Sequence, residues 1–435
     1  MRDILVTLIC IVGWIYTLKR PYFGVLLWSW LSYMSPHRLC YGFALNAPLA
    51  QVTALVLLTS MLLSKETKKF PLNGLTSIWI VFILFMGITT LFAYFPPEAA
   101  LQYKQVIKIQ LIVFLTMMLI TDMDKLNKLI WAIVLSIGYY SVKGGLFTLL
   151  TGGGFKVWGP SGTYIEDNNG LAVAVLMVIP LMVYLIQIND KKWIKQGLIM
   201  AIVFSLFTVV GSQSRGAFLA IMAVGAFYWT KSNSKVVSGV LIAILAISLF
   251  TFMPESWHQR MGSIENYQED GSAMGRINAW KYAFNAANDN LLGVGFESWS
   301  PQTFALYAPN PNDVHAAHSI YFTILADHGW IGLFIYLLIY FMAWRKLGGI
   351  IKQTAKNEEL KQFHSLAKML QVGFIAYLVG GAFLSLSYFD LPWHLISIVI
   401  ILESIVATKL AVPIKIKSLN RQVLNQATRV RPREY

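Results

Sequence analysis

Cysteine and charged residues are both scarce in this chain of 435 residues. Cysteine occurs only twice, and charged residues make up 13% of the sequence against 56% hydrophobic residues. So small a charged fraction excludes an ordinary soluble globular protein, whose surface carries more charge. Cys10 and Cys40 lie too early in the chain, and are too isolated, to form a metal site or a disulfide framework.

The sequence also lacks the ligand spacings that bind metal ions. No His-x-x-x-His or Cys-x-x-Cys pair offers a zinc site, and the acidic pairs at 166–167 and 269–270 lack the ligand series of a calcium loop. We therefore expect an activity that needs no metal ion and no other cofactor.

Apolar segments of membrane-spanning length recur along the chain. Crossing a bilayer takes about 20 apolar residues in a helix, because every backbone N–H and C=O must be paired within the segment. The sequence therefore predicts an all-α polytopic membrane protein with about 12 to 14 transmembrane helices. The expected segments are 4–18, 22–34, 47–63, 77–94, 106–120, 129–150, 171–188, 198–211, 217–229, 236–253, 320–344, 369–386 and 395–412.

Lysine and arginine collect on alternate sides of these segments, and short cytoplasmic loops carry an excess of both residues. The basic connectors are 65–69, 125–128, 191–195, 231–235, 345–368 and the tail from 415 to 433. This bias accounts for most of the net charge of +14, so we expect contacts with membrane lipids and no nucleic-acid binding. The loops expected on the opposite, exported face are 96–103, 152–169, 212–216, 254–318 and 387–393.

Three regions follow from this topology. An N-terminal transmembrane region covers 1–128, a membrane domain covers 129–412, and a basic cytoplasmic tail covers 413–435. The membrane domain includes the large exported loop 254–318, which carries Trp257, Trp280 and Trp299 and suits a folded cap with interfacial helices, one of them at 278–287. We expect the chain in the bacterial inner membrane, with the loop in the periplasm if the cell is Gram-negative.

Arginines on the exported face are the first candidate ligands for a substrate. Arg215 follows Gly211-Ser212-Gln213-Ser214 and stands at the expected mouth of two adjoining helices. A guanidinium holds a phosphate through two parallel N–H contacts, although an interfacial arginine that reaches to lipid head groups explains the placement equally well. Arg260 and Arg276 in the large loop add positive charge, and each alone is typical of a solvated surface residue.

Lys143 is unusual because its ammonium lies inside an apolar segment. Ionisable groups within spans usually face a cavity or a partner, and the alternative is that the side chain extends toward the exported surface. The Gly-rich loop 152–169 follows. Its backbone amides suit an anion and its amide side chains suit sugar hydroxyls, but helix capping by Asp167 or Asn168 explains the same residues more simply.

Two histidines precede the apolar segment at 320. His318 stands where the exported loop enters this helix, and an imidazole there can take a proton from a hydroxyl near neutral pH. His315 is either a helper or a loop surface residue, and we favour the second. Asp327 and His328 follow about 9 and 10 residues later, which at about 1.5 Å per residue predicts packing or a polar network near the middle of the membrane.

Two motifs resemble those of the bacterial O-antigen ligase and polymerase superfamily. Arg215-Gly-Ala-Phe-Leu219 matches its Arg-x3-Leu motif, and His318-Ser319 with Gly329 and Gly332 matches its His-[Asn/Ser/Gln]-x9-Gly-x-x-[Gly/Thr/Tyr] motif. Both occur in the family's order, on either side of one large periplasmic loop. The resemblance covers about residues 130 to 410. The segments 20–28 and 34–39 resemble the O-glycosylation ligase branch associated with exosortase A.

This resemblance implies a multi-spanning, metal-independent, inverting glycosyltransferase with GT-C-like architecture. Its donor is a glycan on undecaprenyl diphosphate, and its acceptor is a hydroxyl on lipid A core, another glycan or a protein. His318 is then the general base, and Arg215 and Arg276 hold the diphosphate and stabilise the charge that develops on it. Lys143, Arg260 and His315 are further candidates for substrate binding.

Two alternatives remain open at this point. A polysaccharide polymerase of the same superfamily uses the same donor and a second lipid-linked glycan as acceptor. A transporter of lipid-linked glycans belongs to another class, and transporters tend to show internal repeats and charges at broken helices in the middle of the membrane. The sequence shows no such repeat, and its candidate groups gather at one face.

Overall fold

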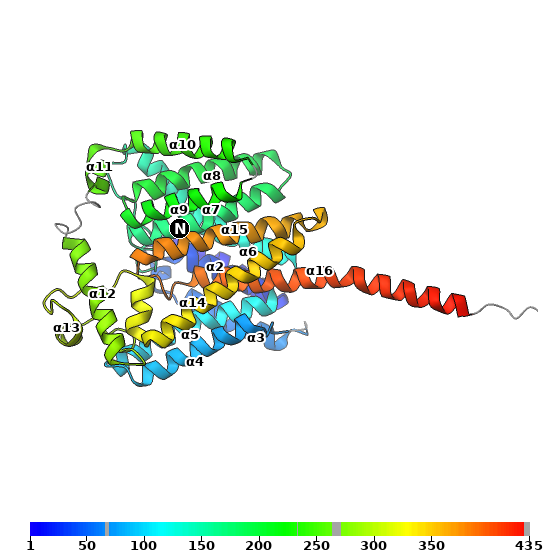
Figure 1. Ribbon diagram of the computed structural model, residues 1–435, viewed down its shortest axis with the longest axis horizontal. Helices are drawn as coiled ribbons and strands as arrows, with labels where there is room; N and C mark the ends of the chain where they lie inside the picture. The colour runs from blue at the N-terminus through cyan, green and yellow to red at the C-terminus, as the bar shows by residue number, and fades with distance from the viewer. Residues whose placement is uncertain (66–68, 233, 263–270, 430–435) are drawn as a thin grey trace, which may run out of the picture.

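The computed structural model is built from helices that run side by side (Figure 1). It describes residues 1–65, 69–232, 234–262 and 271–429, apart from the side chains of residues 231, 241, 245, 260 and 412–429. The α-helices within these residues are α1 (Arg2–Lys19), α2 (Tyr22–Tyr33), α3 (Leu49–Leu63), α4 (Gly74–Leu91), α5 (Pro96–Leu119), α6 (Met123–Leu150), α7 (Asn168–Ile188), α8 (Lys192–Gly211), α9 (Arg215–Lys231), α10 (Lys235–Phe252), α11 (Glu255–Gly262), α12 (Gly271–Asp289), α13 (Pro301–Tyr307), α14 (Ile320–Thr354), α15 (Lys361–Gly380) and α16 (Asp390–Arg429). Short 3-10 turns are η1 (Pro36–Leu39), η2 (Phe43–Asn46), η4 (Glu358–Leu360) and η5 (Gly381–Phe383).

The prediction of an all-α polytopic membrane protein is confirmed. No strand occurs in the described part of the chain, and every apolar segment expected from the sequence overlaps one of the helices. Eight helices among the described residues are long and apolar enough to cross a membrane, namely α4, α6, α7, α8, α10, α14, α15 with its flanking turns, and α16 as far as Ala411. This number is below the 12 to 14 expected, partly because α2, α3 and α9 have only 12, 15 and 17 residues.

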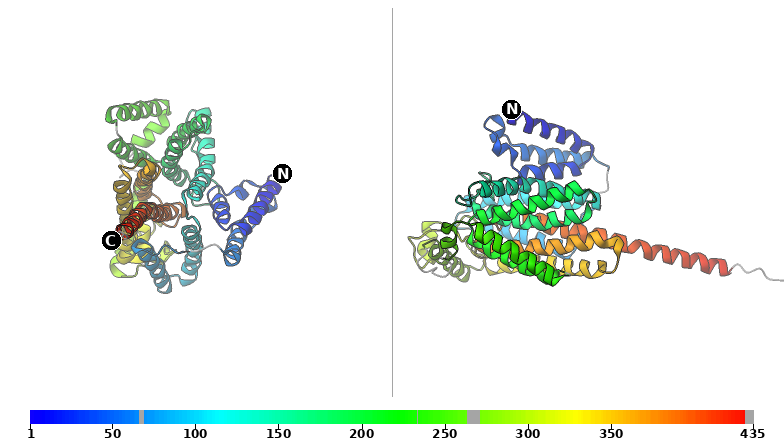
Figure 2. Two further views of the ribbon diagram at one scale, coloured as in Figure 1. Left: turned by 90° about the vertical axis from the view of Figure 1, so that its right-hand side faces the viewer. Right: turned by 90° about the horizontal axis from the view of Figure 1, so that it is seen from above.

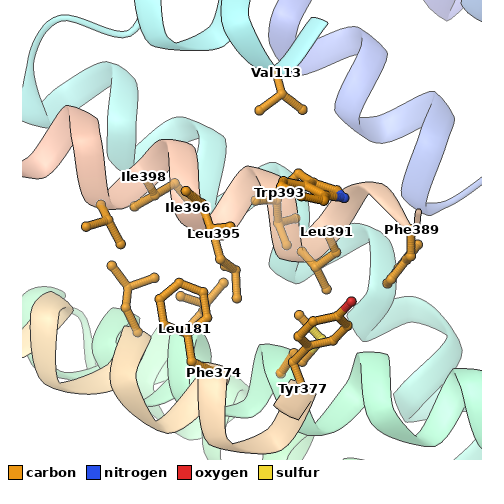
Figure 3. Close-up of a cluster of buried hydrophobic side chains, with 14 of the residues drawn as sticks. Val113, Leu181, Phe374, Tyr377, Phe389, Leu391, Trp393, Leu395, Ile396 and Ile398 are labelled. Carbon is orange, nitrogen blue, oxygen red and sulfur yellow. The ribbon is translucent and has the colours of Figure 1, made fainter. Parts of the chain in front are cut away.

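The core of the bundle forms where the helices α5, α7, α14, α15 and α16 meet. Leu395 of α16 points toward Leu181 of α7 and Phe374 of α15, whereas Trp393 of α16 points toward Val113 of α5 (Figure 3). The N-terminal helices α1 to α3 form a separate layer on one side, which α2 joins to α6 (Figure 2). Burial of these apolar surfaces holds the helices in one arrangement, because the packed side chains leave no room for sliding.

A cap of three helices covers one end of the bundle. α11, α12 and α13 lie there, whereas the C-terminal half of α16 extends from the opposite end (Figure 1). The helix expected at 278–287 is confirmed, since it lies within α12. α12 packs on α14, and the rings of Trp280 and Phe322 stack with centroids 5.0 Å apart. The cap therefore sits directly on the helix that follows His318.

α14 is interrupted at Gly329, whose backbone has φ 65° and ψ −170°. The break frees the carbonyl oxygens of Ala326 and Asp327 from helical hydrogen bonding. The turn after α12 supplies the missing donors, because the N–H of Val294 donates to Ala326 over 2.8 Å and the N–H of Gly295 donates to Asp327 over 3.1 Å. The break in the membrane helix is therefore joined to the cap by backbone hydrogen bonds.

Candidate functional site

The chain segment that carries His318 is fixed by α12. Asn278 donates to the carbonyls of Asn310 and Asp313, each over 2.9 Å, and accepts from the N–H of Asn310. Trp280 donates its indole N–H to the carbonyl of Ala317 over 2.8 Å. These bonds hold the backbone on both sides of His315 and up to the residue before His318, so the cap sets the position of the imidazole.

His318 itself has a left-handed backbone with φ 44°, immediately before α14 begins. A non-glycine residue in this region is uncommon, and such strain concentrates at functional sites. The next residue, Ser319, is buried, and its hydroxyl has no hydrogen-bond partner among the described residues. The imidazole of His318 and the Ser319 hydroxyl therefore belong to consecutive residues at the start of α14.

Three charged or titratable groups act on His318. The residue is exposed, but the surrounding protein atoms displace enough water to lower the pKa of the imidazole below its usual value, and the positive charge of Arg276 lowers that pKa further. Asp167 opposes this effect and His315 adds to it weakly. The structure therefore brings His318 and Arg276 into one electrostatic neighbourhood, and the lowered pKa favours the neutral form of the imidazole.

Asp167 and Asn168 link this neighbourhood to the start of α9. Asp167 caps α7 by accepting from the N–H groups of Asn169 and Gly170, as the capping prediction required. Asn168 donates to the carbonyl of Ser212 over 2.7 Å and so holds the turn between α8 and α9. In that turn Gln213 has φ 54°. The turn that precedes Arg215 is therefore tied to the residue next to Asp167.

Arg215 is the first residue of α9 and is half-buried. Helix N-termini favour negative charge, so an arginine at this position does not stabilise the helix through its dipole. The Ser214 hydroxyl caps the helix instead, by accepting from the N–H of Ala217. The dipole of α9 therefore does not account for an arginine at this position.

η5 connects the two motifs in space. A Cβ at Gly216 would lie 2.9 Å from Phe383, and a Cβ at Gly381 would lie 2.8 Å from Ile320, so both glycines permit close approach. Gly216 follows Arg215, and Ile320 lies two residues after His318. The start of α9 and the start of α14 therefore flank the same short turn.

A large apolar cavity begins about one helical turn below Arg215. It has a volume of about 820 Å³ and follows α9 from Phe218 to Trp229, with its other walls on α7, α8, α10 and α15 and Trp257 at the end near the cap. Its surface is almost entirely hydrocarbon. Such a space suits a long apolar chain whose polar end stays near Arg215.

The remaining candidates are His315, Lys143 and Arg260. His315 is exposed and pairs with Asp313 over 2.7 Å, which agrees with a loop surface residue. Lys143 lies on the wall of a second cavity of about 370 Å³, whose lining includes none of His318, Arg215 or Arg276. The side chain of Arg260 lies outside the described residues.

A buried polar network at the break in α14 includes two residues that the sequence gave no reason to select, Tyr388 and Thr89. Tyr388 donates to Asp327 over 2.6 Å and contacts His328 over 3.0 Å, and Thr89 contacts the other ring nitrogen of His328 over 2.7 Å. The polar network predicted for Asp327 and His328 is therefore present. Tyr388 and Thr89 could not be found from the sequence, because they are about 60 and 239 residues distant from His328.

The described residues contain no cluster of three or more His, Cys, Asp or Glu side chains that could hold a metal ion. Metal independence stays a prediction.

Comparison with known families identifies the region that carries both motifs. The O-antigen ligase family model matches residues 200–337. The chain contains an O-antigen ligase family domain.

This O-antigen ligase domain contains Arg215, Arg276, His318 and the break at Gly329. The resemblance seen in the two motifs is therefore confirmed, and the chain is a multi-pass protein of a membrane glycan ligase and polymerase superfamily. A family of unknown function, DUF5935, matches residues 1–190, which include Lys143 and Asp167. No curated protein matches the chain.

Proposed function

We propose that the protein transfers a glycan from undecaprenyl diphosphate to an acceptor hydroxyl at the periplasmic face of the bacterial inner membrane. The observation that carries this proposal is the electrostatic neighbourhood of His318 and Arg276, beside a large apolar cavity that begins just below Arg215. A reaction of a lipid diphosphate needs a base, cationic groups for the phosphates and an apolar space for the lipid.

In the proposed reaction, His318 takes the proton of the acceptor hydroxyl, and the freed oxygen attacks the anomeric carbon of the donor sugar. The bond from that carbon to the phosphate oxygen breaks, and the electron pair leaves with the diphosphate. Arg215 and Arg276 stabilise the charge that develops on the leaving oxygen. The lowered pKa of His318 supports the base role, since the neutral imidazole is the form that accepts a proton.

The apolar cavity supports a polyprenyl tail as the hydrophobic part of the donor. A lipid lying against α9 brings its diphosphate to the first turn of that helix, where Arg215 stands. The acceptor, which we expect to be lipid A core, a protein or a glycan, then approaches from the side of the cap. Membership in the exosortase-associated branch would favour a protein acceptor, and that branch remains part of the proposal.

The test is a transfer assay with the purified full-length chain in lipid nanodiscs. Undecaprenyl-diphosphate-linked glycan is incubated with lipid A core, a candidate acceptor protein or a second lipid-linked glycan, and the product is identified by mass. We expect His318→Ala to abolish transfer, and Arg215→Lys to lose most of it because lysine lacks the paired N–H donors. His364→Ala, a histidine at the far end of the bundle, is the matched control and should keep transfer.

Wild-type transfer by His318→Ala would contradict the base role. A product formed only with the lipid-linked acceptor would assign the polymerase activity instead. If lipid-linked glycan crosses the membrane only when the chain is present, and no glycan is transferred, the protein would be a transporter.

A further inference from the structure

The second cavity is built where α6 meets the loop before α7. Its walls come from Tyr140, Lys143 and Phe147 of α6, from the loop at 156–161, and from Leu39 at the end of η1. Its volume is about 370 Å³. Every one of these residues lies within the region 1–190, to which the family comparison gives no function.

Two lysines line this cavity, and no carboxylate lines it. They are Lys143, which lies within a membrane-spanning helix, and Lys156 at the start of the loop. Within the described part of the chain, Lys143 has no salt-bridge partner. Lys143 is exposed, so an anion can reach its ammonium from the surface, and the two lysines make the cavity suited to an anion.

Glu166 is bonded to Ser161 on the wall of this cavity. It accepts from the hydroxyl of Ser161 over 3.0 Å and from the N–H of Gly162 over 2.7 Å, and these bonds lower the pKa of its carboxyl below the usual range. The Arg38 guanidinium adds further positive charge, because it lies 3.1 Å from where a Cβ of Gly162 would be. The cavity and its rim therefore keep an excess of positive charge.

Exposed aromatic side chains lie at this cavity and suit a membrane surface. Trp158, which lines it, is 61% exposed, and Phe155 just before it is 65% exposed. Exposed tryptophan beside apolar residues is typical of the boundary between lipid tails and head groups. Lys143 and Lys156 beside the apolar lining residues therefore suit a molecule in which a phosphate is joined to a hydrocarbon chain.

The loop that forms this cavity continues directly into the neighbourhood of His318. Gly159 donates its N–H to the carbonyl of Glu166 over 2.9 Å, which closes the loop, and the next residue is the Asp167 that acts on His318. A ligand held at Lys156 would therefore restrain the segment that ends at Asp167.

We propose that this cavity binds the phosphate head group of an anionic membrane lipid, at the same end of the bundle as His318. The site is separate from the one we assign to the donor diphosphate. The proposal does not depend on glycan transfer, because the binding of a lipid is measured without donor or acceptor. It gives the region of unknown function a role in holding a lipid beside the transfer site.

The experiment measures lipid binding to the purified full-length chain in detergent by native mass spectrometry. The probes are dihexanoyl phosphatidylglycerol, dihexanoyl phosphatidylcholine and inorganic phosphate. We expect the phosphatidylglycerol to bind more tightly than either of the others. Lys143→Gln with Lys156→Gln should weaken it by about tenfold or more, since each lysine near a membrane surface contributes a modest attraction to an anionic lipid.

Two matched double variants complete the test. Lys191→Gln with Lys192→Gln removes the same charge from exposed lysines at the far end of the bundle and should leave binding unchanged. Lys143→Arg with Lys156→Arg keeps the charge and should retain binding. The proposal would be overturned by an equal loss of lipid binding in both glutamine variants or by no loss in either. It would also be overturned if inorganic phosphate bound as tightly as the lipid.

Discussion

Replacing Gly329 with alanine should destabilise the break in α14 and the cap that is bonded to it. The backbone at Gly329 has φ 65° and ψ −170°, a region that is open almost only to glycine and costs other residues about 1 to 3 kcal/mol. A Cβ there would also overlap the carbonyl oxygen of Leu291 and lie 2.9 Å from the nitrogen of Gly293. Both are backbone atoms, which cannot rotate away as a side chain can.

We therefore expect Gly329→Ala to lower the free energy of unfolding by about 3 kcal/mol or more, the strain and the overlap acting together. Gly348→Ala in the same helix is the control. A Cβ at Gly348 meets no described atom within 4 Å, and its backbone is helical. Alanine there should stabilise the helix by about 1 kcal/mol or less, because it loses less backbone freedom than glycine does.

The assay is unfolding of the purified chain by a graded increase of denaturing detergent, followed by tryptophan fluorescence. Limited proteolysis between residues 290 and 318 reports the cap separately. We expect faster cleavage there in Gly329→Ala, because the bonds from Val294 and Gly295 depend on the break. Equal unfolding curves for the two alanine variants, with unchanged cleavage, would refute the role of the glycine backbone.

Two further predictions concern charges and hydrogen bonds near the site. Arg276→Gln should raise the pKa of His318, and Asp167→Asn should lower it. The pH dependence of the modification of His318 by diethylpyrocarbonate should therefore shift in opposite directions in the two variants. Shifts in the same direction would contradict the effects that we assign to Arg276 and Asp167. Tyr388→Phe should destabilise the fold by about 1 to 3 kcal/mol by leaving the buried Asp327 without its donor, and unchanged detergent unfolding would count against that bond.

Much of the fold could be predicted from the sequence, because a membrane restricts the choices. A lipid-exposed segment must satisfy its own backbone, so an apolar stretch such as 171–188 has no alternative to a helix, and α7 covers it. The helix ends were harder to predict. α5 begins ten residues before the expected segment, because its first turns combine Pro96 and Glu98, which are suited to a helix start but are not apolar.

The candidate site was predictable only in part. His318, Arg215 and Arg276 were found through two motifs and one basic residue in the loop, and the family domain at 200–337 contains all three. Asp167 was identified from the sequence as a helix cap and has that role. Its electrostatic effect on the pKa of His318 could not be predicted, because it depends on how the fold places two residues that are 151 positions apart in the chain.

The break in α14 shows why such long-range features escape prediction and why they still constrain function. A glycine in an apolar helix is compatible with a straight helix, so the sequence at Gly329 alone does not reveal an interruption. The interruption becomes stable only because Val294 and Gly295 donate to the carbonyls that it exposes. The same α12 that leads into this turn also holds the backbone before His318 through Trp280. The cap is therefore bonded to the chain both just before α14, at Ala317, and at the break within α14. A movement of the cap must displace the imidazole of His318 relative to the membrane helices.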